Sequence, residues 1–143
     1  MGDYKKILLV VDLSDDSQII GERAKAIAAC YQSEITLLHV VEYVPVEPMG
    51  EALLPTVQIE GELVDRARHR LSELATRLSL EGSRQLVETG GIKTEIIRAA
   101  HKLNVDLIVL GSRERHGLAI LLNFTEDTIL HAAPCDVLAV RLH

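Results

Sequence analysis

The stretch VDLIVLGSRERHGLAILLNFTEDT, residues 105–128, combines a buried strand, a glycine, a loop and a helix start. Val105–Leu110 is a short run of branched apolar residues, which is typical of a central strand covered on both faces. Gly111 follows it and predicts a tight turn at the carboxyl end of that strand. Thr125, followed by two acidic residues, predicts the N-cap of another helix. In an open parallel sheet ligands bind at this edge, and a helix start facing a glycine turn can hold an anion.

The remaining chain alternates between β-prone runs and amphipathic helical patterns. Strands are predicted at Lys5–Val11, Glu34–Val41, Gln85–Glu88, Val105–Leu110 and Asp136–Val140. The first helix is predicted to follow a Ser14 cap, with Asp15 and Asp16 in its first turn, where the helix dipole favours negative charge. Three more helices are predicted over Glu60–Leu80, between Gly91 and Asn104, and over Thr125–Ala132. This alternation predicts an α/β protein, a three-layer sandwich with a five-stranded parallel sheet and helices on both faces.

One long segment, Glu42–Ile59, breaks the alternation. Pro45, Pro48 and Pro55 fall within it, and prolines at that density argue against a long helix or a central strand. We expect an irregular segment there, which is either a lid or a surface excursion.

Composition narrows the class of protein. The 143 residues fit one domain, 1–143, and no apolar run approaches the roughly 18 residues that span a bilayer. A net charge of −6, with no Trp and one Phe, disfavours nucleic-acid binding. Cys30 and Cys135 form no CxxC pair, so we expect reduced, buried side chains in a cytoplasmic protein, and no metal site.

Four segments in this order resemble the universal stress protein family. They are VDLS at 11–14, LLHV at 37–40, DLIVLGS at 106–112 and HAAPCDVLAV at 131–140, and the resemblance spans essentially the whole chain. It implies an adenine nucleotide alpha hydrolase-like fold with strand order 3-2-1-4-5. It also implies a role in surviving stress or growth arrest and a homodimer, usually formed through the last strand.

The same resemblance assigns candidate nucleotide-binding residues. Family members that bind ATP carry G-x-x-G-x9-G-[ST] after the fourth strand, and the first glycine of that motif falls on Gly111 and its last position on Thr125. Gly117 lies in the spacer, where glycine is common. Asp12 matches the aspartate on the ribose or adenine side, and the adenine edge falls on Val40 and Val41.

Two positions depart from that motif, because Glu114 and Phe124 stand where it has glycine. Glycine lets a backbone N–H approach phosphate oxygens, whereas Phe124 adds bulk and Glu114 adds negative charge, as do the neighbouring Glu126 and Asp127. The sequence therefore resembles the universal stress protein A-like branch, and we expect no ATP and no other cofactor. The alternative is an ATP or AMP sensor, or a slow ATPase, in which Arg113 contacts phosphate.

Other polar residues allow two interpretations. Asp12 either binds a ribose or caps the following turn, and His39 is expected to be a hydrogen-bonded wall histidine rather than a catalyst. No nucleophile–base pair or Walker lysine is visible, so we do not expect an enzyme.

The last strand has no helix after it to cover its edge. An exposed apolar edge favours pairing with a second copy, which would give a two-fold homodimer. Other protein partners are not identified by the sequence. The expected interface residues are Val137, Leu138, Ala139, Val140 and Leu142.

Overall fold

Strands and helices alternate along the chain much as the sequence predicts. The structure, a computed structural model, describes residues 3–42, 53–113 and 129–142, with the backbone alone at 53–59 and 113. Residues 129–132 are also helical. The other elements are β1 (Lys6–Val10), α1 (Ser17–Tyr31), β2 (Glu34–Val41), α2 (Leu53–Arg77), β3 (Arg84–Thr89), α3 (Ile92–Leu103), β4 (Leu107–Arg113) and β5 (Asp136–Leu142).

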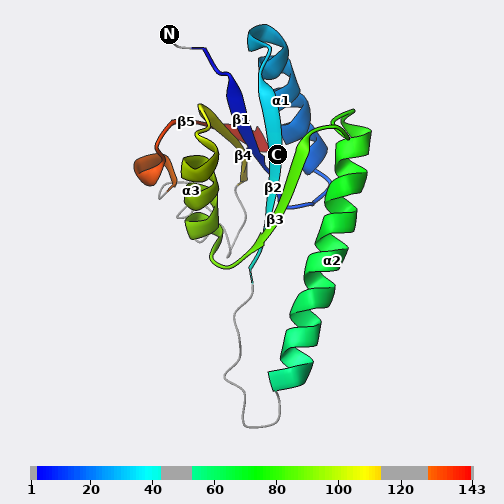
Figure 1. Cartoon of the computed structure of the whole chain (residues 1–143). Coiled ribbons are helices and arrows are strands. Elements are labelled where there is room, and N and C mark those ends of the chain that lie inside the picture. Colours follow the sequence, from blue (N-terminus) through cyan, green and yellow to red (C-terminus); the bar gives the residue numbers. More distant parts are fainter. Residues whose placement is uncertain (1–2, 43–52, 114–128, 143) are drawn as a thin grey trace.

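The strands form one parallel sheet in the order β3-β2-β1-β4-β5 (Figure 1). This confirms both the predicted fold class and the predicted strand order. In the middle of the sheet, Leu8 of β1 lies opposite Thr36 of β2 and Ile108 of β4. The chain runs outward from β1 to β3 and then returns to place β4 on the other side of β1. The carboxyl ends of β1 and β4 therefore flank the point where the strand order reverses, which is the usual ligand crevice of such sheets.

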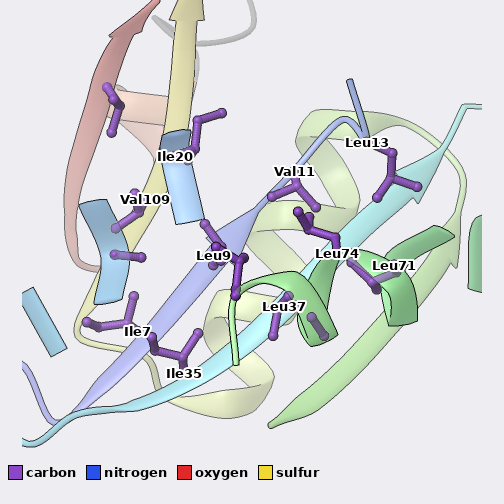
Figure 2. Packing of buried hydrophobic residues seen from close by; sticks show 14 of the residues in the cluster. Ile7, Leu9, Val11, Leu13, Ile20, Ile35, Leu37, Leu71, Leu74 and Val109 are labelled. Atoms are coloured by element: carbon purple, nitrogen blue, oxygen red, sulfur yellow. The ribbon is translucent and has the colours of Figure 1, made fainter. Parts of the chain in front are cut away.

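Helices cover both faces of the sheet, with α1 and α2 on one side and α3 on the other (Figure 1). Under α1 and α2, Leu9 and Leu37 from the strands pack with Leu74 in one buried cluster (Figure 2). Under α3, Leu8 and Ile108 pack with other residues of a second cluster. Consecutive residues Ile7, Leu8 and Leu9 are fully buried, as expected of a strand covered on both faces. The cluster under α3 also contains Leu38, Ile96, Ala100 and Ile129.

Both early helices start elsewhere than predicted. α1 begins at Ser17 rather than after Ser14, because the chain first makes a turn in which the Ser17 N–H donates to the Ser14 carbonyl at 3.0 Å. Consequently Asp15 and Asp16 precede the helix. α2 begins at Leu53, within the segment predicted to be irregular. Pro55 is compatible with this helix because the first-turn N–H groups have no intrahelical partner to lose.

The prediction that Cys30 is buried is wrong, because its side chain is exposed on α1. The buried stripe of α1 runs through Ile20, Ala24 and the half-buried Ile27. At about 3.6 residues per turn, position 30 lies about a quarter of a turn away from the centre of that stripe. Cys135 is half-buried and packs against the second cluster, in line with its prediction.

Candidate functional site

The residues predicted to bind a nucleotide begin with Asp12, directly after β1 at the carboxyl edge of the sheet. Its Oδ1 accepts one hydrogen bond from the Ser14 backbone N–H at 2.9 Å and another from the Ser17 hydroxyl at 3.1 Å. Asp12 therefore caps the turn between β1 and α1, as one of its two interpretations predicts. Its contact with a ribose stays a prediction.

Two side chains from other elements hold the same turn. His39 of β2 contacts the Val11 carbonyl through Nδ1 at 2.8 Å, and since a carbonyl can only accept, Nδ1 carries the proton. Arg70 of α2 donates from Nη2 to the carbonyl of Leu13. Leu13 is buried and has a left-handed backbone with φ of 64°, which is uncommon for a branched residue. These contacts fix the turn, and His39 is a hydrogen-bonded wall residue as predicted.

The contact from Arg70 was not predictable from motif spacing. It joins positions 57 residues apart, and an arginine on an amphipathic helix gives no sign of which carbonyl it will meet. Only the placement of α2 beside the end of β1 could have indicated it.

Val40 and Val41 end β2 beside this turn and form an apolar wall. Val40 is buried in the cluster under α3, while Val41 is half-buried and packs against the cluster under α1 and α2. The backbone N–H of Gly90 donates to the Val41 carbonyl at 3.2 Å, which ties the end of β3 to the end of β2. The wall is apolar on both faces of the sheet.

Gly111 lies inside β4, opposite Val140 of β5, so the prediction of a tight turn there is wrong. The strand continues to Arg113 because the pairing with β5 extends that far. A Cβ placed on Gly111 would stand 2.6 Å from Cδ1 of Ile20 and 2.9 Å from Cδ1 of Leu142. The glycine is therefore explained by close packing of α1 and β5 against β4.

The sheet brings three of the predicted residues to one edge. Leu9, Leu37 and Val109 form one row across β2, β1 and β4. Asp12 and Val40 lie three positions beyond that row, and Gly111 lies two positions beyond it, so all three stand at neighbouring carboxyl ends. Gly117, Thr125, Glu114 and Phe124 lie outside the described residues, as do Glu126 and Asp127, and only the backbone of Arg113 is described.

The expected dimer strand, β5, divides its side chains between core and surface. Val140 and Leu142 are buried in the cluster under α1 and α2, because alternate residues of a strand point to the same face. Val137 and Leu138 are half-buried, and Ala139 is exposed. The side chains of Val140 and Leu142 belong to the core, so these two residues could meet a partner only through their backbone, and the interface itself stays a prediction.

A groove of about 470 Å³ runs beside β5 on the α1 side of the sheet. Tyr4, Ile27, Tyr31 and Leu138 give it an apolar lining. The Tyr4 hydroxyl donates to Oδ2 of Asp136 at 2.8 Å, and this hydrogen bond raises the pKa of Tyr4. The rings of Tyr4 and Tyr31 meet edge to face with centroids 5.2 Å apart. The groove thus joins α1 to the first residues of β4 and β5.

The described parts of the chain contain neither a metal-binding cluster nor a membrane-spanning helix. Residues 3–42, 53–113 and 129–142 contain no group of three His, Cys, Asp or Glu side chains able to hold a metal ion. No helix in this described portion has the length and apolar composition needed to cross a bilayer.

Comparison with known proteins gives consistent matches over nearly the full length. The Universal stress protein family model matches residues 3–141. Universal stress protein A homolog 1 of Coxiella burnetii is 41% identical over 138 residues, which are 96% of each chain. The structure of universal stress protein UspA from Lactobacillus plantarum matches with a TM-score of 0.76 and 27% identity, over 99% of this chain and 100% of that one.

A more distant neighbour shares the fold alone. It is a universal stress protein crystallised in complex with cAMP, with a TM-score of 0.64 and 18% identity, over 97% of this chain and 98% of that one. Together, the sheet order, the family match and the full-length relative lead to one assignment. This chain belongs to the universal stress protein family.

Proposed function

We propose that this protein is a cytoplasmic stress-response homodimer that acts through protein contacts and does not turn over ATP. The observation that carries the proposal is the edge of β5. Within the described residues β5 pairs with β4 on one side only, and Ala139 is exposed on it. An unpaired edge of this kind is a ready template for another strand.

The surroundings of β5 support a second copy of the chain as its partner. Two-fold pairing joins the same strand of both subunits and covers both edges at once. Leu138 and the aromatic rings of Tyr4 and Tyr31 line a groove beside β5, on the side of the sheet that α1 covers. Apolar surface beside a strand edge adds burial to the backbone hydrogen bonds of such an interface.

The experiment compares Ala139→Asp with Ala26→Asp by sedimentation velocity. Ala26 is exposed on α1 and provides the same chemical change away from the strand edge. We expect a dimer for the native protein and for Ala26→Asp, and a monomer with an unchanged circular dichroism spectrum for Ala139→Asp. Like charges that face each other across paired strands are destabilising. A dimeric Ala139→Asp variant would contradict the proposed interface.

The absence of ATP turnover is supported by the sequence of the loop and by the geometry of the turn. Glu114 and Phe124 occupy the glycine positions of the ATP motif. At the other side of the crevice, Oδ1 of Asp12 already accepts two hydrogen bonds from its own turn. A ligand that uses this oxygen must therefore compete with Ser14 and Ser17.

Calorimetric titration with ATP tests this part of the proposal. We expect no micromolar binding by the native protein and a gain in affinity when Glu114→Gly and Phe124→Gly are combined. Micromolar affinity in the native protein would contradict the proposal. An unchanged affinity in the double variant would show that those two side chains are not the obstacle.

The second candidate function is an ATP or AMP sensor, or a slow ATPase with an altered loop. It is favoured by the fold shared with a neighbour crystallised with cAMP and by the gathering of Asp12, Val40 and Gly111 at one edge. Chromatography of the small molecules released on denaturation separates the two functions. One nucleotide per chain supports the sensor, and none supports the protein-contact function.

A further inference from the structure

Side chains of β5 alternate between the two faces of the sheet, and this alternation limits how the strand can pair with its own copy. Leu138, Val140 and Leu142 pack into the cluster under α1 and α2, whereas Val137 packs against the cluster under α3. Even-numbered residues of β5 therefore share one face of the sheet, and odd-numbered residues share the other.

A two-fold axis fixes the direction of the second strand and the face on which each of its residues lies. Two copies of one strand that pair about such an axis in a continuous sheet run antiparallel. The axis stands perpendicular to the sheet, so the α1 side of one subunit continues into the α1 side of the other. Residues directly opposite each other point to the same face, so even positions pair with even positions and odd with odd. Only registers centred on a residue, rather than between two residues, meet this condition.

The register centred on Ala139 pairs the whole of β5. It places each of the 7 residues of the strand opposite a residue of the second copy, whereas a centre at Leu138 or Val140 leaves one end of each strand unpaired. Unpaired backbone groups at a sheet edge are the liability that strand pairing removes. Ala139 is exposed and has the smallest side chain of β5, so its two copies can face each other at the axis without crowding.

The charges of β5 also favour the antiparallel arrangement. Asp136 begins the strand, Arg141 precedes its last residue, and both are exposed. Antiparallel pairing along the whole strand brings the amino end of one copy beside the carboxyl end of the other, so Asp136 comes near the partner's Arg141 and opposite charges attract. A register centred on either charged residue would instead set two like charges opposite each other, which is destabilising.

Given the homodimer proposed above, we infer that β5 pairs antiparallel with its copy about an axis at Ala139. On the α3 side of the sheet, Ala139 then lies opposite itself, and Val137 lies opposite the partner's Arg141, whose methylene stem can cover it. On the α1 side, Leu138 lies opposite the partner's Val140, beside the groove between α1 and β5. The second copy thus extends the apolar surface of that groove across the axis.

Disulfide trapping of single-cysteine variants tests the register. In a background with Cys30→Ser and Cys135→Ala, the variant Ala139→Cys places two thiols opposite each other, where Cα atoms of antiparallel strands lie about 4.5 to 5.5 Å apart. A disulfide can join Cα atoms at that separation. We expect mild oxidation to convert this variant into a covalent dimer on a gel run without reductant. Val137→Cys is the matched control, because its two copies would be about 14 Å apart along the strands, which is too far for a disulfide.

A pair of variants provides an independent test of the same register. Val137→Cys and Arg141→Cys should each stay monomeric on the gel when oxidised alone. Produced together in one cell, they should give a covalent dimer that contains one chain of each, because these two positions lie opposite each other. A mixed dimer supports the register even if Ala139→Cys disturbs the axis.

The possible outcomes separate the register from the dimer. Sedimentation velocity of the background protein gives the subunit number, and a monomer would refute the dimer and the register together. A dimer that crosslinks through Leu138→Cys but not through Ala139→Cys would overturn the register alone, because the axis would then lie one residue away. A dimer that none of these cysteines crosslinks would overturn the pairing through β5 and leave the subunit number standing.

Discussion

Replacing Gly111 by alanine separates a packing role for this glycine from a phosphate-binding role. The added Cβ would stand 2.6 Å from Cδ1 of Ile20 and 2.9 Å from Cδ1 of Leu142. Both atoms are the ends of core side chains, with Ile20 3% and Leu142 9% exposed, so the added methyl group requires these side chains to repack. Overpacking of this kind typically costs about 1 to 3 kcal/mol of unfolding free energy.

The sign of the effect is informative, because a Gly→Ala change without a clash acts in the opposite direction. It stabilises a protein by about 0.4 to 1 kcal/mol by restricting the unfolded chain. Gly61→Ala provides the matched control, since Gly61 lies in α2 and nothing stands within 4 Å of a Cβ there. We expect Gly61→Ala to be more stable than the native protein and Gly111→Ala to be less stable. Urea denaturation followed by circular dichroism measures both.

A double-mutant cycle with Ile20→Val identifies the atom responsible. This change removes Cδ1 of Ile20, the nearest atom to the added Cβ. Alone it should cost about 0.5 to 1.5 kcal/mol as a truncated core residue. Combined with Gly111→Ala it should cost at least about 0.5 kcal/mol less than the sum of the two single changes, because they relieve one clash. A stabilising Gly111→Ala, or strictly additive effects, would refute the packing explanation.

Three further predictions follow from burial and hydrogen bonding. Cys30 is exposed, so it should react with a thiol reagent in the folded protein well before the half-buried Cys135. Burial raises the pKa of the Cys135 thiol, so labelling of Cys135 should accelerate as the pH rises, and equal rates for the two cysteines would contradict this. Nitrogen NMR should find the Nδ1–H tautomer of His39, which donates to Val11; the Nε2–H tautomer would show that this bond is absent. Val140→Asp should unfold the chain, because it would bury a carboxylate that has no partner. A circular dichroism spectrum of a folded variant would contradict this and would indicate that the side chain at position 140 lies at the surface.

Much of the fold was predictable because its strands are buried on both faces. Such strands appear as continuous apolar runs, and Glu34–Val41 was predicted with the same bounds that the structure shows. Helix α3 also starts and ends as predicted, since Gly91 stands at its N-cap and Asn104 takes a left-handed backbone at its C-cap.

The errors arose where a residue type has more than one structural use. Gly111 was predicted to make a turn, but the reason for glycine there is the approach of Ile20 and Leu142, which come from distant parts of the sequence. Pro55 was predicted to exclude a helix, although the first turn of a helix tolerates proline. Local patterns contain no information about which of these uses applies.

The candidate site was predictable only in part, for a similar reason. The resemblance placed Asp12 and Val40 at one edge of the sheet, and strand order alone brings them together. The bond from Arg70 to Leu13 depends on how α2 packs, so no motif contains it. Burial of Val140 follows from the direction of alternate side chains on β5, and the run of four apolar residues at 137–140 does not reveal which of them point inward.

Native mass spectrometry of the freshly purified protein tests the central claim most directly, because one spectrum reports both subunit number and bound small molecules. The claim is that two copies associate without a nucleotide. The predicted result is a single species of twice the 15.8 kDa chain mass, with no added mass of ATP or AMP. A monomer, or a species that carries one nucleotide per chain, would contradict the account.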